Sequence, residues 1–366
     1  MKVLALSSYG VLGGGELSLA EYLARRPEEV HAEAVVLEAG PLADVLAKDG
    51  IPTRVASHAG RPSARDFVRF GRSLSRLLRV SRPDVVWATG FKAAVLAVPA
   101  CRVHRVPIVW HKIDFSRDST ITKPLAACVN GVICVSEAVG QSLGFLRRRR
   151  LIAVIGPPVR LPPDAAAPPN ADRIIGTLGR LVPLKGHDHI LRAASRLRSE
   201  FPDLRVVLAG DGEPHHPDYP DELRALTRAL DLENCVDFTG FVTDIVSLAS
   251  RLRIYVNATH RDSQGYGLEG LSGAMLEASW LGLPVVAYRG GGTAEGMRNG
   301  VTGTLVERPD PEALADALTP YLRDHTLALR HGSAGRRFVQ ERFGSDLAAQ
   351  NLFDALERAA RRSRPR

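Results

Sequence analysis

Two glutamates, Glu269 and Glu277, lie eight positions apart in a stretch whose residue types could bind a phosphate and the groups on either side of it. Between them, Ser272 precedes a short apolar run that closes on Gly282, which is the pattern of a helix start and a helix stop. With Ser272 as the N-cap, the amides of residues 273–275 point out of the helix end, where backbone dipoles favour an anion such as a phosphate. Two glutamates at this spacing also occur on ordinary solvated helix faces, so the flanking sequence decides between the two interpretations.

Arg180 and Lys185 supply the positive charge that such a site needs. Both follow the expected strand Arg173–Leu178, in the sequence Gly-Arg-Leu-Val-Pro-Leu-Lys-Gly. Two cations fixed at the end of a strand can neutralise a departing diphosphate without a metal ion. Arginine and lysine in such loops are also common as solvated surface residues, which is the alternative interpretation.

A glycine run follows the first expected strand, Lys2–Ser7. Gly14 and Gly15 open the next expected helix and let the backbone approach a phosphate or a sugar closely. The run has the spacing G-x-x-G-G-G, which differs from the G-x-G-x-x-G spacing of dinucleotide-binding folds. His111 ends a later strand and places an imidazole at the carboxyl edge of the same sheet, although a single histidine there is more often structural.

Short apolar runs alternate with amphipathic stretches along the chain, which predicts βαβ units around parallel sheets and an α/β fold. The expected strands of the first half are Lys2–Ser7, Glu33–Leu37, Val85–Ala88, Ile108–Trp110 and Val132–Val135. Those of the second half are Arg173–Leu178, Arg205–Ala209, Val236–Thr239, Ile254–Asn257, Pro284–Ala287 and Thr304–Val306. Two such doubly wound sheets place ligands at the carboxyl ends of their strands.

A proline-rich segment between the two halves suits neither helix nor strand and predicts a linker. The last segment has the pattern of a helix that begins at Ser345. The expected division is a first domain at 1–158, a linker at 159–172, a second domain at 173–344, and a C-terminal helix with a basic tail at 345–366.

The block from Glu269 to Glu277, followed by Gly-Leu-Pro-Val-Val, resembles the E-x7-E signature of the retaining family-4 glycosyltransferases. Arg180 and Lys185 resemble the diphosphate clamp of that family, and the resemblance is densest over residues 174–306. It implies a GT-B architecture, in which two Rossmann-like doubly wound domains face a central cleft and the C-terminal helix crosses back to the first domain. It also implies that Glu269 approaches the transferred sugar and that Glu277 holds the ribose of the nucleotide donor.

Other positions take their expected roles from the same resemblance. Gly14 and Gly15 would lie against the donor phosphate and the acceptor, and His111 would hydrogen-bond the donor sugar. The positions expected near the nucleotide are Asp211, Phe241 and Val242. An Asp-Gly turn and a packed aromatic residue would explain these last positions equally well.

The signature departs from the commoner family pattern in two places. Leu271, Ser272 and Gly273 stand where family members usually have Phe-Gly-Leu, and residues 290–295 lack the proline of the usual Ile-Pro-Glu. The amides and carboxylates remain, so residues 271–273 are still expected to contact the donor. The departures bear on the identity of the donor sugar.

The expected function is a retaining, metal-independent glycosyltransferase without a cofactor. It would move a sugar from a nucleotide-diphosphate donor to a glycan, a lipid-linked or a small-molecule acceptor. The residues assigned to catalysis are Glu269, His111, Arg180 and Lys185. Two alternatives stay open: a non-catalytic GT-B protein that binds a nucleotide sugar or a glycan, and a GT-B nucleotide-sugar epimerase, which the E-x7-E block and the clamp disfavour.

The composition limits the classes of protein that fit. With 366 residues, of which 45% are hydrophobic and 24% charged, the chain has the composition of a globular protein with two domains. The apolar run at the N-terminus is too short for a signal peptide, and no segment reaches the ~18 apolar residues of a membrane span, so a cytoplasmic location is expected. The four cysteines show no C-x2-C spacing and indicate neither a metal site nor a disulfide framework.

The excess positive charge is confined to the first half of the chain. Residues 1–158 contain 22 Lys and Arg against 13 Asp and Glu, while the remainder contains 26 against 27. Within residues 64–82, arginines recur with a helical period beside an apolar stripe, which predicts a basic amphipathic helix. Its apolar side could pack on the core, or the helix could make peripheral contact with an anionic inner membrane surface or an acceptor. No basic motif interleaved with aromatic residues occurs, so nucleic acid is not an expected partner.

Overall fold

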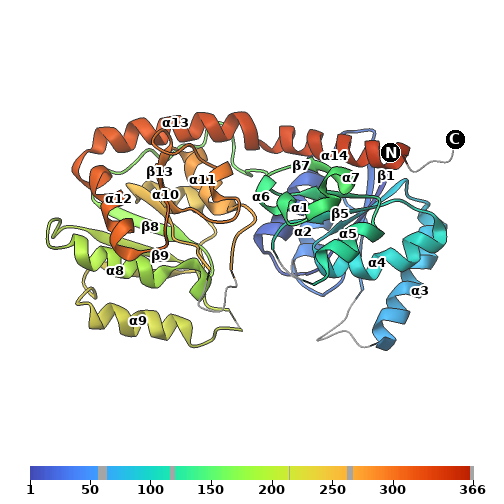
Figure 1. The fold of residues 1–366 in the computed structure, drawn as a ribbon, viewed down its shortest axis with the longest axis horizontal. Coiled ribbons are helices and arrows are strands. Elements are labelled where there is room, and N and C mark those ends of the chain that lie inside the picture. Colours follow the sequence, from blue (N-terminus) through green and yellow to red (C-terminus); the bar gives the residue numbers. More distant parts are fainter. Residues whose placement is uncertain (57–63, 116–119, 214, 262–266, 363–366) are drawn as a thin grey trace. The chain divides into compact units, whose positions relative to one another are not determined.

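The computed structural model describes residues 1–56, 64–115, 120–213, 215–261 and 267–362 (Figure 1). The chain forms two compact units. Unit 1 comprises Met1–Pro158 together with Phe343–Arg366, and unit 2 comprises Val159–Arg342. Both units are α/β, as the alternation of apolar runs predicts.

Unit 1 contains a seven-stranded parallel sheet in the order β3-β2-β1-β4-β5-β6-β7. Its strands are β1 (Lys2–Ser7), β2 (His31–Val36), β3 (Thr53–Val55), β4 (Val85–Thr89), β5 (Ile108–Lys112), β6 (Gly131–Cys134) and β7 (Leu151–Val154). Its helices are α1 (Gly14–Ala24), α2 (Leu42–Lys48), α3 (Ala64–Ser81), α4 (Phe91–His104), α5 (Thr122–Cys128), α6 (Glu137–Gln141), the short η1 (Gly144–Leu146), α7 (Arg147–Arg150) and α14 (Ser345–Arg362). Side chains of α14 share one buried cluster with α1, α2 and the strands, so the C-terminal helix belongs to the core of unit 1.

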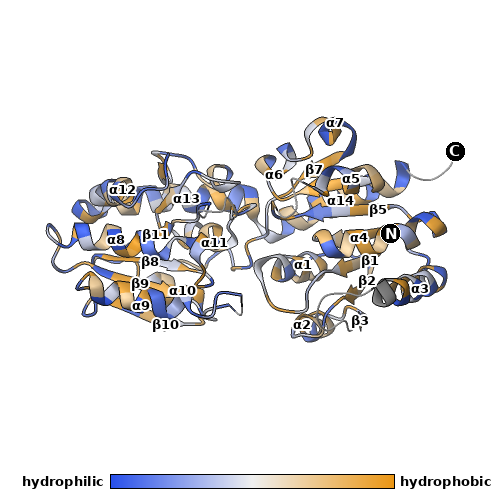
Figure 2. Ribbon diagram, turned by 60° about the horizontal axis from the view of Figure 1, so that its bottom comes forward, coloured by the Kyte–Doolittle hydropathy of each residue, from blue (hydrophilic) through white to orange (hydrophobic). Residues whose placement is uncertain are grey.

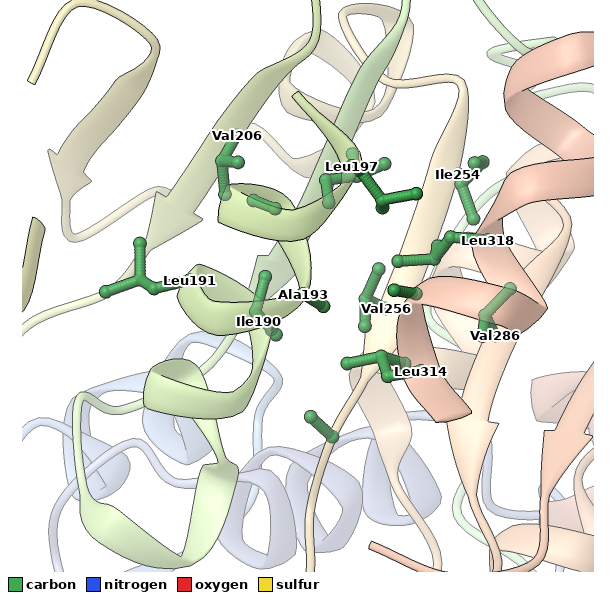
Figure 3. Close-up of a cluster of buried hydrophobic side chains, with 14 of the residues drawn as sticks. Ile190, Leu191, Ala193, Leu197, Val206, Ile254, Val256, Val286, Leu314 and Leu318 are labelled. Atoms are coloured by element: carbon green, nitrogen blue, oxygen red, sulfur yellow. The ribbon is translucent and has the colours of Figure 1, made fainter. Parts of the chain in front are cut away.

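Unit 2 contains a six-stranded parallel sheet in the order β10-β9-β8-β11-β12-β13. Its strands are β8 (Ile174–Leu178), β9 (Arg205–Ala209), β10 (Val236–Gly240), β11 (Ile254–Asn257), β12 (Val285–Tyr288) and β13 (Gly303–Val306). Its helical elements are η2 (Pro183–Lys185), α8 (His187–Leu197), α9 (Tyr219–Ala229), α10 (Ile245–Ser250), α11 (Gly273–Leu281), η3 (Thr293–Glu295), α12 (Pro311–Arg323) and α13 (His325–Phe343). Figure 3 shows part of its core, where aliphatic side chains of α8 and α12 pack on β9, β11 and β12.

Each sheet grows outward from its middle, because the first strand of each unit pairs with the second on one side and the fourth on the other. The loops after these two central strands turn to opposite faces, which opens a ligand site between them in doubly wound folds. In unit 2 the two central strands are β8 and β11. Arg180 and Lys185 follow β8, and Glu269 follows β11, so the fold brings the three expected charges to one edge.

The proline-rich segment 159–172 packs on unit 2. The amides of Ala167 and Asn170 donate to the carbonyls of Leu281 and Leu252, both at 2.8 Å. Trp280 donates from its indole Nε1 to the carbonyl of Pro162 at 2.9 Å. The segment forms no helix or strand of its own, and these bonds attach it to unit 2 rather than leaving it as a separate linker.

Helix α3 is amphipathic, as its sequence predicts (Figure 2). In its described side chains, the apolar positions Phe70, Leu74, Leu77 and Leu78 are buried. The arginines at 69, 72, 76 and 79 are exposed. The apolar stripe therefore packs in the core of unit 1, while the basic face is open to solvent. None of the helices in the described part of the chain has the combination of length and apolarity that spanning a bilayer requires.

Candidate active site

The helix between the two glutamates begins and ends where the sequence predicts. Ser272 is the N-cap of α11, and its hydroxyl accepts a hydrogen bond from the amide of Met275 at 3.4 Å. Gly282 closes the helix with a φ of 99°, a conformation that suits glycine. The sequence predicts three free amides, at residues 273–275. This prediction is wrong for Met275, because its amide donates to the Ser272 hydroxyl. The amides of Gly273 and Ala274 have no partner among the described residues.

Lys185 and Glu269 are in direct contact: Nζ of the lysine donates to Oε1 of the glutamate. The two side chains are only 17% and 20% exposed. The hydroxyl of Thr259 lies 3.0 Å from the other carboxylate oxygen, Oε2. Burial by itself raises the pKa of Glu269, but Lys185 and hydrogen bonds from Thr259 and Asn257 outweigh it, so the pKa lies below its ordinary value. Glu269 is therefore held ionised.

Backbone contacts fix the turn that carries Lys185. The amide of His260, after β11, donates to the carbonyl of Leu184 at 3.0 Å. Gly186 has a φ of 67°, and a Cβ there would lie 2.3 Å from the carbonyl oxygen of Ala258. Only glycine fits this approach, which ties the lysine turn to the segment that follows β11.

Arg180 lies at the surface of the same edge and is 60% exposed. Its Nη1 donates to Oε1 of Glu213 at 2.6 Å. The loop that carries it is held by the carbonyl of Asp211, which accepts from the amide of Leu181 at 2.8 Å. Gly210 has a φ of 141°, and a Cβ there would lie 1.9 Å from the carbonyl oxygen of Gly179. Asp211 thus positions the Arg180 loop through its backbone, while its side chain is exposed.

Glu277 lies on α11 and is 16% exposed. Its Oε1 is 3.5 Å from Nη2 of Arg160, in the proline-rich segment. Burial raises the pKa of Glu277, and Arg160 offsets only part of this effect. Lys185, Arg180 and Arg160 therefore each contact one glutamate of unit 2, namely Glu269, Glu213 and Glu277.

The remaining expected residues of unit 2 differ in exposure. Phe241 follows β10 and is 72% exposed, whereas Leu271 is 9% exposed beside the N-cap. Val242 is half-buried. A flat aromatic ring exposed at the carboxyl end of a strand can cover a planar base, while a buried Leu271 supports the start of α11.

In unit 1 the glycine run forms the start of α1, with Gly13 as N-cap. A Cβ on Gly14 would meet nothing within 4 Å, so this position opens to free space. A Cβ on Gly15 would lie 2.6 Å from Cδ1 of Ile113, after β5. The run is therefore packed on the loop after β5 on one side and open on the other.

His111, on β5, is 3% exposed. Its ring lies 6.0 Å from the rings of both Trp87 and Tyr22, measured between centroids. Neither ring nitrogen has a hydrogen-bond partner among the described residues. Desolvation lowers the pKa of this imidazole to about 4, so the ring is neutral at physiological pH.

This burial makes the stability of unit 1 depend on pH. The unfolded imidazole takes up a proton below about pH 6.5, whereas the folded one does so only near pH 4. Protonation thus favours the unfolded state as the pH falls through this window, and the group should remove about 3 kcal/mol of the free energy of unfolding between its two limits. His111→Leu, similar in volume, should flatten this part of the pH dependence.

Urea unfolding followed by tryptophan fluorescence would measure this effect, since Trp87 and Trp110 both lie in the core of unit 1. The wild-type and His111→Leu midpoints should diverge between about pH 6.5 and pH 4. Parallel curves for the two proteins would show that the folded histidine titrates normally.

Four side chains that contact the expected site residues escape the sequence analysis. Thr259 and Asn257 lie at the carboxyl end of an apolar strand, and polar residues at such an edge are a usable signal. Arg160 and Glu213 come from a proline-rich segment and a loop, and no local pattern connects them to the two glutamates. Their contacts are set by tertiary packing alone.

The fold defines a class of protein: an α/β protein with two Rossmann-like units. The sequence model described as "Glycosyl transferases group 1" matches residues 163–338, and that of "Glycosyltransferase Family 4" matches residues 16–161. Together they cover both units. The chain belongs to the family-4 glycosyltransferases with the GT-B architecture.

Several characterised proteins are similar in sequence. A lipopolysaccharide core biosynthesis mannosyltransferase of Rhizobium leguminosarum is 31% identical over 244 residues, which are 64% of this chain and 66% of the relative. A GDP-mannose-dependent α-(1-6)-phosphatidylinositol monomannoside mannosyltransferase of Mycolicibacterium smegmatis is 35% identical over 168 residues, 45% of this chain and 43% of the relative. The chain thus matches between about half and two thirds of the length of these relatives.

Solved structures share the fold at lower identity. HepE of Anabaena, in complex with UDP-glucose, superposes with a TM-score of 0.83 at 22% identity, over 98% of this chain and 100% of that one. The lipopolysaccharide outer core galactosyltransferase WaaB superposes with a TM-score of 0.77 at 14% identity, over 98% and 99% of the two chains. Both likenesses concern the fold.

Proposed function

We propose that this protein transfers a sugar from a nucleoside-diphosphate donor to an acceptor, with retention of anomeric configuration and without a metal ion. The contact between Lys185 and Glu269 carries the proposal. The contact connects the segments that follow the two central strands of unit 2, β8 and β11. Glu269 also lies three residues before the N-cap Ser272, so a cation, a carboxylate and the outward amides of α11 meet at one edge of the sheet. Such an edge suits a sugar diphosphate, which has an anionic part and a hydroxyl-rich part.

In the proposed reaction the diphosphate lies between Lys185, Arg180 and the amides of Gly273 and Ala274. The bond from the anomeric carbon to the phosphate oxygen breaks, and its electron pair leaves with the diphosphate, which these groups stabilise. An acceptor hydroxyl attacks the anomeric carbon from the face that the diphosphate leaves. Its proton passes to the departing phosphate, so the charges balance.

The carboxylates have separate tasks in this proposal. Ionised Glu269 orients the hydroxyls of the transferred sugar and opposes the positive charge that develops on it. Glu277 accepts from the ribose hydroxyls, and displacing the 3.5 Å contact with Arg160 costs little because that pair is long and partly exposed.

The names of the relatives suggest where to look for substrates. We place GDP-mannose first among donors, because two of the relatives named above are mannosyltransferases and one is GDP-mannose-dependent. UDP-glucose comes second, because it occurs in the HepE complex. A lipid-linked or lipopolysaccharide-type glycan is the first acceptor class to test, before small molecules.

Incubation with nucleotide sugars, with and without acceptors, tests the proposal. We expect nucleoside diphosphate release that depends on the acceptor, survives EDTA, and yields by NMR a product with the donor's anomeric configuration. Donor binding without release would indicate a non-catalytic binding protein. Conversion of the donor alone would indicate an epimerase, and inversion in the product would reject the retaining mechanism.

We also propose that unit 1 makes peripheral contact with anionic lipid through the exposed basic face of α3. The apolar stripe of α3 is buried in unit 1 and is not free to insert into a bilayer. The proposed contact therefore rests on attraction between the exposed arginines and anionic lipid headgroups. Each basic residue near an anionic surface contributes about 1 kcal/mol. Replacing the four exposed arginines at 69, 72, 76 and 79 by glutamine should therefore weaken vesicle binding by up to about 10³-fold.

Co-sedimentation with phosphatidylserine-containing vesicles measures this binding. Binding should weaken with added salt and be absent with neutral vesicles. The matched control removes four exposed arginines of unit 2, namely Arg196, Arg224, Arg251 and Arg323. Equal losses in the two variants would assign the effect to net charge and contradict a role for α3.

A further inference from the structure

Thr259 follows β11 and contacts the carboxylate at the centre of the site. It is 4% exposed, and its neighbour Asn257 is 5% exposed. The hydroxyl of Thr259 lies 3.0 Å from Oε2 of Glu269 and 2.8 Å from Oδ1 of Asn257. Glu269 is thus held on both oxygens, by Lys185 at Oε1 and by Thr259 at Oε2.

A hydroxyl has one proton, so Thr259 can donate to only one of its two acceptors at a time. A hydrogen bond to an ionised acceptor is roughly twice as strong as one between neutral groups. The ionised Glu269 therefore attracts the proton in preference to the neutral amide of Asn257. Asn257 in turn accepts from the backbone amide of Thr259 at 3.3 Å, which fixes the turn.

The placement of Thr259 does not depend on Glu269. Strand β11 is buried along its length. The amide of His260, the residue after Thr259, donates to the Leu184 carbonyl. Gly186 packs closely on Ala258, one residue earlier. The backbone on both sides of Thr259 is thus held against the turn that carries Lys185. This fixed position lets the Thr259 hydroxyl orient the Glu269 carboxylate.

We propose that Thr259 is a positioning residue of the transferase reaction: its hydroxyl fixes the plane of the Glu269 carboxylate and favours the ionised form. The inference rests on the proposed function, which gives Glu269 its role toward the sugar. It assigns no contact with the substrate to Thr259 itself. It predicts that the hydroxyl matters and that the volume of the side chain does not.

The first test measures Glu269 without catalysis. Side-chain carboxyl resonances of 13C-labelled glutamate would be titrated in wild type, Thr259→Val and Thr259→Ser, and Glu269→Gln would assign the signal. Loss of a donor to the carboxylate should raise its pKa in Thr259→Val by about half a unit or more, while Thr259→Ser keeps the wild-type value. Lys185 and Tyr255 also face this carboxylate and are unchanged in both variants.

The second test is kinetic. Thr259→Val should lower kcat by about 10-fold to 100-fold with a nearly unchanged KM for the donor, and the acid limb of the pH–rate profile should move to higher pH. Thr259→Ser should restore both. The matched control is Thr227→Val, because Thr227 is equally buried but its hydroxyl only donates to the Leu223 carbonyl within α9.

The outcomes separate the two claims. An unchanged Glu269 titration in Thr259→Val, or a serine variant as impaired as the valine one, would overturn the positioning role. A wild type without acceptor-dependent release, but with the shifted titration in Thr259→Val, would overturn the proposed function and leave the positioning of Glu269 standing.

Discussion

Replacement of Lys185 by alanine is expected to lower kcat by about 10³-fold, since loss of one preorganised group that stabilises a developing anion costs 10² to 10³ in rate. The lysine is the least exposed cation at this edge, at 17%, and its turn is fixed by the Leu184 and Gly186 contacts. Nucleoside diphosphate release under saturating donor and acceptor measures the effect.

The fold should survive this change, but the free energy of unfolding should fall by roughly 1–3 kcal/mol because Glu269 loses its partner. The double variant Lys185→Ala/Glu269→Gln should recover most of that stability and none of the activity. Arg196→Ala, which removes an exposed cation paired with Glu312 and Asp316, serves as the control and should stay near wild type. Near-normal turnover in Lys185→Ala would contradict the clamp.

Replacement of Glu269 by glutamine is expected to lower kcat by about 10²-fold to 10³-fold, because the neutral amide no longer opposes positive charge on the sugar. Binding of the nucleoside diphosphate product, in contrast, should become tighter. Lys185 is paired with Glu269 in the free protein, so neutralising the glutamate leaves the lysine available to the diphosphate. The Kd for nucleoside diphosphate should therefore decrease several-fold, which calorimetry can measure.

Glu213→Gln is the matched control for this variant. Glu213 pairs with Arg180 at the same edge, but it lies on the loop after β9 and has no proposed contact with the sugar. It should affect diphosphate binding and leave kcat within a few-fold of wild type. A Glu269→Gln variant with normal kcat, or with weakened diphosphate binding, would contradict the assigned role.

The sequence predicts the parts of this structure that depend on local patterns. Ser272 and Gly282 bound α11 as predicted, and strands β1, β9 and β11 begin and end at the expected residues. These elements combine strong apolar periodicity with clear capping or turn residues. The charges of unit 2 meet at one edge because strand order in a doubly wound sheet follows from chain order.

Other parts depend on packing that no local pattern reports. Strand β3 is short, and Arg54 and Val55 are exposed, so its apolar signal is weak; β7 follows the arginine run of α7 and is only half-buried. The sequence places His111 at a strand end, but only the tertiary structure shows that Trp87 and Tyr22 enclose it. The partners of the three cations come from distant segments, so their pairing appears only once the chain is folded.

The central claim is that unit 2 binds the leaving diphosphate between Lys185, Arg180 and the start of α11. A crystal structure with GDP, or with UDP if that binds more tightly, tests it most directly. The account predicts phosphate oxygens within hydrogen-bond distance of Lys185 Nζ, the Arg180 guanidinium and the Gly273 and Ala274 amides, with the ribose on Glu277. A diphosphate bound elsewhere, with Lys185 still paired to Glu269, would contradict it.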